Sequence, residues 1–146
     1  MANTSSATRS NGRAQRIRPR RRPRGERTYV APSTRHGRGV FAAERIGRGV
    51  EIERCPVLIV PGNRATALDR AGLRGYCYEW GRDLALALGH GSLYNHSFRP
   101  NAECEALLDE GVLVIRSRRV IEPGEEITLD YTGARNRKSL WFDAVD

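Results

Sequence analysis

The chain has 146 residues, a formal net charge of +8 and 39% hydrophobic residues, with no apolar run of 18 residues. This length predicts one domain that can bury a core, and the lack of a long apolar run argues against a transmembrane helix. The N-terminus is polar and then arginine-rich, without the apolar segment of a signal peptide. We therefore expect an intracellular, soluble protein without membrane contact, cytoplasmic if bacterial and nuclear or host-nuclear otherwise.

Residues 1–27 carry nine arginines and one acid, Glu26, and so hold the whole net charge. They show no apolar periodicity, which predicts a disordered, arginine-rich arm. Such an arm could contact nucleic acid by binding phosphates, or it could be a solubilising tail, and the sequence leaves both open.

From residue 28 onward, short segments typical of β-strands alternate with Gly and Pro turns. Residues 64–75 favour one short helix, ended by Gly72 or Gly75. The pattern predicts a mostly β domain over residues 28–146, built from several short sheets with little helix. The expected strands are residues 28–32, 39–44, 50–60, 102–108, 112–118 and 126–131.

The three cysteines, Cys55, Cys77 and Cys104, form no CxxC pair. This spacing signals neither a zinc site nor a disulfide framework, so we expect buried free thiols and no bound metal.

Two segments in the first half of this domain could carry chemistry. In HGRGVFA, Gly37 and Gly39 permit close approach of a ligand to the backbone, although a lone GxG is also a common turn. In YCYEWG, Tyr76, Tyr78 and Trp80 alternate and would share one face of a strand. That face is either part of the core or an aromatic wall that could embrace a cation.

Two further segments follow. In GSLYNHSFRPNAE, Asn95 and His96 precede Pro100-Asn101, and the one imidazole has no partners spaced for a metal site. In VIEPGEEITLDYTG, a Pro-Gly turn leads to a strand that ends at Tyr131. Its two glutamates, at positions 125 and 126, are interpreted as surface or turn-capping groups, which leaves no obvious general base.

In this order, the segments resemble the SET domain, a family of protein lysine methyltransferases. The family shows a GxG, an NHS-x-x-PN loop and a G-E-E/Q-[IL]-x-x-x-Y strand. The segment ALALGHGSLYNHS (85–97) is most similar to minimal viral and bacterial members, which lack zinc-binding flanking segments. This chain departs from the usual pattern with Phe98 after NHS and Thr132 between Tyr131 and Gly133.

The resemblance implies a β-clip-like fold in which the NHS loop and the C-terminal segment cross in a knot-like arrangement. It implies S-adenosylmethionine as cofactor and a narrow channel for the substrate lysine. By this analogy Tyr131 is the catalytic tyrosine, and Tyr76, Tyr78 and Phe142 line the channel. The implied cofactor-binding residues are Gly37, Arg38, Gly39, Tyr94, Asn95, His96 and Trp141.

Within that set, the resemblance places Asn95 at the amino acid end of the cofactor and the His96 backbone at its adenine. Trp141 and Phe142 belong to a short C-terminal cover (135–146), and core packing is the alternative for both. Pro100 and Asn101 are assigned a structural duty at the loop exit.

The expected activity is methylation of lysine in a protein substrate, such as a basic or histone-like tail. The alternative is a catalytically weak SET module whose arginine-rich arm binds nucleic acid or an acidic partner. A homodimer is compatible with a minimal SET domain, but the sequence does not decide the oligomeric state.

Overall fold

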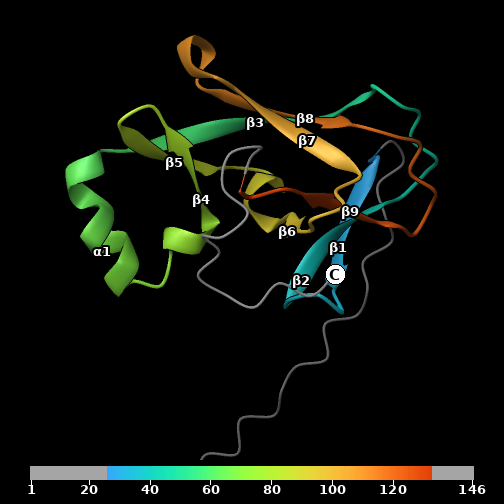
Figure 1. Ribbon diagram of the computed structural model, residues 1–146, viewed down its shortest axis with the longest axis horizontal. Helices are drawn as coiled ribbons and strands as arrows, with labels where there is room; N and C mark the ends of the chain where they lie inside the picture. Colours follow the sequence, from blue (N-terminus) through green and yellow to red (C-terminus); the bar gives the residue numbers. More distant parts are fainter. Residues whose placement is uncertain (1–25, 133–146) are drawn as a thin grey trace, which may run out of the picture.

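The computed structural model describes residues 26–132. These residues form two β-sheets and contain little helix (Figure 1). The first sheet has the order β1-β2-β9-β6, and the second has the order β4-β5-β3-β8-β7. This architecture confirms the mostly β prediction. The strands of the first sheet are β1 (Thr28–Pro32), β2 (Arg38–Ala42), β6 (Asn95–His96) and β9 (Glu126–Leu129). Those of the second are β3 (Glu51–Val60), β4 (Cys77–Trp80), β5 (Asp83–Ala87), β7 (Ala102–Leu107) and β8 (Val112–Ser117).

The helical content is one short α-helix, α1 (Ala65–Arg70), and four 3-10 turns among the described residues. The helix is shorter than expected and ends before Gly72, whose φ of +68° takes the left-handed conformation that terminates helices. Figure 1 shows α1 at one end of the molecule, beside β4 and β5 and remote from the β1–β2 hairpin. The 3-10 turns are η1 (Gly62–Arg64), η2 (Arg74–Tyr76), η3 (Gly91–Leu93) and η4 (Leu108–Glu110).

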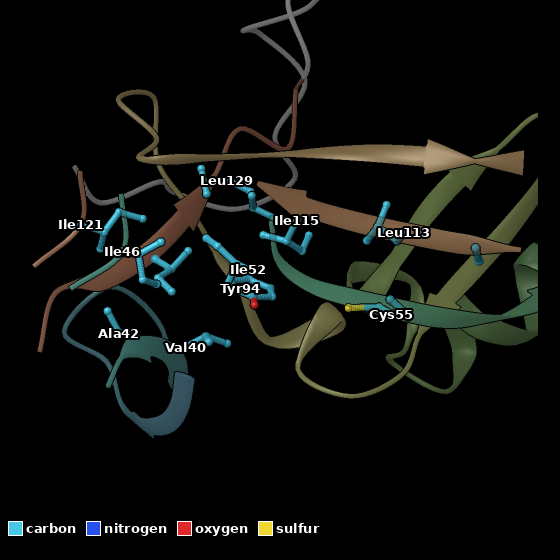
Figure 2. Packing of buried hydrophobic residues seen from close by; sticks show 14 of the residues in the cluster. Val40, Ala42, Ile46, Ile52, Cys55, Tyr94, Leu113, Ile115, Ile121 and Leu129 are labelled. Atoms are coloured by element: carbon cyan, nitrogen blue, oxygen red, sulfur yellow. The ribbon is translucent and has the colours of Figure 1, made fainter. Parts of the chain in front are cut away.

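The two sheets share one hydrophobic core. Tyr94 is completely buried and belongs to the cluster, together with Val40 and Ala42 of β2 and Leu113 and Ile115 of β8. Figure 2 shows Ala42 at one end of this cluster and Leu113 with Cys55 at the other. Burial of aliphatic side chains from both sheets therefore fixes the sheets against each other.

Strand β9 organises the site because it lies between β2 and β6. It pairs antiparallel with β2, with Val40 opposite Ile127, and parallel with β6, with Asn95 opposite Thr128. The expected knot-like crossing involves the C-terminal segment and lies outside the described residues. No helix within residues 26–132 is long and apolar enough to cross a membrane.

Candidate active site

The GxG segment forms the turn that enters β2. The Ser33 N–H donates to the Gly37 carbonyl at 3.0 Å, and Gly37 has a φ of +49°, which favours glycine. Gly39 is needed for a different reason: a Cβ there would overlap the Glu126 carboxylate and lie 3.0 Å from Nδ2 of Asn95. The second glycine therefore lets β2 approach the start of β9 and the NHS segment closely.

The NHS segment is held against both neighbours in the first sheet. Nδ2 of Asn95 donates to the His36 carbonyl (3.1 Å), the Arg38 carbonyl (3.2 Å) and Oε1 of Glu126 (2.8 Å). His96 is buried, and its Nδ1 accepts the Tyr131 N–H at 3.1 Å. The three motifs, which are far apart in sequence, thus meet on three adjacent strands of the first sheet, β2, β9 and β6.

Tyr131 lies at the centre of this arrangement, immediately beyond β9. Its ring is 5.4 Å from that of His96, and its hydroxyl donates to the Tyr94 carbonyl. The residue remains 41% exposed, so a ligand can reach it. Burial of the hydroxyl, together with the nearby Tyr76, Cys104 and Glu126, raises the pKa of Tyr131 to about 12. The phenol is therefore a neutral hydrogen-bonding group at physiological pH and not a base.

The aromatic segment 76–80 does not form the continuous strand face that its alternation predicts. Tyr76 ends the 3-10 turn η2 and is 45% exposed, whereas β4 begins only at Cys77. Trp80 is in the core and cannot belong to an accessible wall. Cross-strand pairing with β5 covers residues 77–80 alone, which explains why the turn before them is not extended.

Tyr76 and Tyr78 nevertheless both lie close enough to Tyr131 to interact with it electrostatically. The Tyr78 hydroxyl donates to the Gly91 carbonyl at 2.5 Å. Burial raises the pKa of Tyr78 well above that of free tyrosine, with a smaller contribution from Cys104. The structure therefore brings together three tyrosines that the sequence assigned to the catalytic centre and its channel.

Tyr94 has a different place from the other candidate residues. Its side chain is buried in the core, and its hydroxyl donates to Oε2 of Glu53 at 2.8 Å. Its contribution to the site is the main-chain carbonyl that accepts from Tyr131. Tyr94 is fully buried, so the structure offers no exposed surface of this residue to a cofactor. Trp141 and Phe142 lie outside the described residues.

Three residues near the site were missed or misread from the sequence. Glu126 was expected at the surface, but its side chain is only 12% exposed and bonds to Asn95 and to Ser33 Oγ (2.9 Å). Glu125, its neighbour, does cap a turn, because it accepts the Glu122 N–H and pairs with Arg119. Glu125 lies in the turn that precedes β9, whereas Glu126 is the first residue of the strand, and sequence alone does not say which of the two adjacent acids faces Asn95.

Glu53 lies in the alternating pattern of β3, and nothing in that pattern indicated a role near the site. Its carboxylate accepts the His90 N–H at 2.9 Å as well as the Tyr94 hydroxyl, so it anchors the segment that leads into the NHS motif. Cys104 of β7 is exposed and lies near Tyr78 and Tyr131. The three cysteines are free thiols as expected, but only Cys55 is buried, so the expectation of burial is wrong for Cys104 and only partly met by Cys77.

A model of the SET-domain family matches residues 37–132, which begin at the GxG turn and end just after Tyr131. The chain belongs to the SET-domain family. It is 31% identical over 116 residues to a histone-lysine N-methyltransferase of Schizosaccharomyces pombe described as H3 lysine-37 specific, covering 78% of this chain and 76% of that protein.

The fold is also similar to the crystal structure of a candidate histone methyltransferase from Plasmodium falciparum, with a TM-score of 0.63 and 30% identity. That match covers 75% of this chain and 96% of the other. These similarities confirm both the SET fold and the enzyme class, protein-lysine methyltransferase.

Proposed function

We propose that this protein transfers a methyl group from S-adenosylmethionine to the side-chain amine of a lysine in a protein substrate. The observation that carries the proposal is the convergence of the GxG turn, Asn95 and Tyr131 around β9. Three sequence motifs separated by more than 20 residues each become neighbours in one sheet, and two exposed tyrosines, Tyr76 and Tyr131, belong to the same site.

The donor set of the site fits this cofactor. S-adenosylmethionine has an ammonium and a carboxylate at its amino acid end, and its sulfonium supplies the methyl group. Asn95 offers its side-chain oxygen as an acceptor for the ammonium, because its nitrogen is already turned toward the GxG turn. The guanidinium of Arg38, which is exposed at the start of β2, offers a charge for the carboxylate.

The chain's residues can also prepare the lysine. A lysine amine has an ordinary pKa of about 10.4 and must lose a proton to become nucleophilic. Packing between the rings of Tyr76 and Tyr78 would favour the neutral amine by desolvation. The Tyr131 hydroxyl, held by the Tyr94 carbonyl, would orient the amine nitrogen, and positioning of this kind removes much of the entropic cost of transfer.

The pH dependence of the rate follows from the ionisation of the substrate lysine and that of Tyr131. We expect kcat/KM to rise between pH 7 and about 10 as the lysine substrate loses its proton. Because the pKa of Tyr131 is raised to about 12, its ionisation should produce no falling limb in this range. Initial rates in constant-ionic-strength buffers, with protein unfolding followed in parallel, would measure the profile. A decline near pH 10 in folded enzyme would mean that Tyr131 titrates as an ordinary phenol.

Asn95→Ala is expected to weaken binding of S-adenosylhomocysteine, the demethylated product, about tenfold, as the loss of a hydrogen bond to a charged group does. Asn95 is only half-buried, so water can replace its bonds to the two carbonyls, and Glu126 keeps its bond from Ser33 Oγ. Although the bond from Asn95 to Glu126 is lost, the mutation should weaken cofactor affinity more than it lowers the cofactor-free melting temperature. Calorimetric titration and thermal unfolding of the same preparation give both values. A large loss of stability with unchanged affinity would make Asn95 a structural residue.

For the substrate, we propose a basic, histone-like tail, supported by the histone methyltransferases that this chain resembles. Such a substrate and cofactor would place the enzyme in the cytoplasm or the nucleus. The direct test is transfer of labelled methyl to histones and other basic proteins, followed by amino acid analysis for methyl-lysine. Failure of the purified protein to bind S-adenosylhomocysteine, or label recovered on arginine, would reject the proposal.

The division into an arm (1–27) and a SET domain (28–146) also remains a proposal, together with nucleic-acid contact by the arm. Its support is the charge, since the nine arginines of the arm account for the whole excess of +8. Deleting residues 1–27 should leave S-adenosylhomocysteine binding unchanged and abolish salt-sensitive DNA binding. Equal DNA binding by the truncated protein would place the nucleic-acid contact on the domain instead.

A further inference from the structure

Glu126 is a largely buried acid in the middle of the motif cluster. It begins β9 and faces Gly39 of β2, where no Cβ could be accommodated. Its Oε1 accepts from Nδ2 of Asn95 at 2.8 Å and its Oε2 from Ser33 Oγ at 2.9 Å. Nε of Arg35 lies 3.9 Å away, which makes a loose ion pair with the same carboxylate. Glu126 thus connects β9, the turn before β2 and the NHS segment.

The surroundings of Asn95 allow only one orientation of its amide. Nδ2 faces the His36 carbonyl, the Arg38 carbonyl and the Glu126 carboxylate, which are all acceptors without a proton. A rotation of the amide by half a turn would set Oδ1 against these three oxygens. The bond to Glu126 is the shortest of the three and is charge-assisted, so the carboxylate contributes most to this preference.

We propose that Glu126 is a positioning residue that acts through Asn95, by holding Nδ2 so that Oδ1 is presented to the ammonium group of the cofactor. The inference rests on the proposed function, since it concerns the amino acid end of S-adenosylmethionine. Glu126 itself need not touch the cofactor. Its negative charge acts on the Asn95 amide, and the Asn95 amide is the group that contacts the cofactor.

The inference makes a specific prediction for ligands with and without the ammonium group. Glu126→Ala should weaken binding of S-adenosylhomocysteine about tenfold, the effect of losing a charge-assisted hydrogen bond. It should leave unchanged the affinity for the deaminated analogue, in which hydrogen replaces the amino group. Glu126→Gln should recover much of the loss, because its amide oxygen can still accept from Asn95. Glu44→Ala, a change at an exposed acid just after β2, is the control and should bind both ligands as the wild type does.

A double-mutant cycle separates positioning from direct attraction. If Glu126 acts through Asn95, Glu126→Ala should have no further effect on S-adenosylhomocysteine affinity in an Asn95→Ala background. An additive loss would mean that the carboxylate attracts the ammonium through space, and this would overturn the positioning role. An equal loss for the deaminated analogue would make Glu126 a general structural residue and would overturn it too.

One measurement uses the wild-type protein alone and so does not depend on the folding of a variant. In the cofactor-free wild type, the Asn95 side-chain amide protons should exchange with water more slowly than those of exposed Asn63, as followed by nuclear magnetic resonance. Equal exchange rates would show that the amide is not held.

If wild-type protein does not bind S-adenosylhomocysteine, the proposed function fails. If it binds and Glu126→Ala binds equally well, the inference about Glu126 alone fails.

Discussion

Replacing Tyr131 by phenylalanine is expected to lower turnover about 100-fold while leaving cofactor affinity and the fold nearly intact. The substitution removes one hydroxyl and almost no volume, so the ring can keep its place 5.4 Å from His96. The Tyr131 N–H that bonds to His96 is part of the main chain and is retained. What is lost is the oxygen that orients the amine, and a small misplacement of reacting groups costs about this factor.

The measurement is single-turnover methyl transfer at saturating cofactor, with S-adenosylhomocysteine affinity determined separately. Tyr29→Phe is the matched control, because Tyr29 lies on β1, where it stacks on Phe41 at 5.6 Å. It should keep wild-type turnover. A Tyr131→Phe enzyme with full activity would remove this hydroxyl from the reaction. A Tyr131→Phe enzyme that loses cofactor affinity instead would show that the hydroxyl mainly supports the binding site.

The strands that could be predicted from sequence are those with alternating or β-branched residues between turn residues. Residues 28–32 form a strand with the expected bounds, and residues 112–118 form one that is a residue shorter. β5 (Asp83–Ala87) was missed because it consists largely of Leu and Ala, which do not specify a strand. It is extended because it pairs with β3 and β4 on its two sides, an interaction that local sequence does not encode.

The site shows the same division between local and long-range information. The sequence motifs identified Asn95 and Tyr131 as candidate site residues. The groups that these two residues contact are set by the pairing of strands in the sheet. β6 has only two residues and exists because Asn95 and His96 pair with β9. No sequence pattern could show that the Tyr131 hydroxyl meets the Tyr94 carbonyl or that Glu126, and not Glu125, faces Asn95.

Asn101→Ala is expected to lower the free energy of unfolding by about 3 kcal/mol, the largest stability effect that we predict. The Asn101 side chain is buried, its Oδ1 accepts the Thr128 N–H at 2.8 Å, and its Nδ2 donates to the Glu126 carbonyl at 2.7 Å. Alanine would leave both main-chain groups of β9 without these partners. Each unsatisfied buried group costs about 1–3 kcal/mol.

The loss should be measured by urea unfolding and should lower the melting temperature by roughly 10 °C in a domain of this size. Asn63→Ala, at an exposed position in η1, is the control and should change stability by less than about 0.5 kcal/mol.

Hydrogen exchange adds a local readout, because Asn101 holds β9 and not the β3–β5 pair. Amides of Thr128 and Leu129 should exchange faster in Asn101→Ala at temperatures where the amide of Ile59 remains as protected as in the wild type. Uniform acceleration throughout the domain would mean that Asn101 supports global stability without holding β9 in place. If β9 alone is loosened, the GxG turn, Asn95 and Tyr131 lose the strand that they share, so cofactor affinity and turnover should fall together.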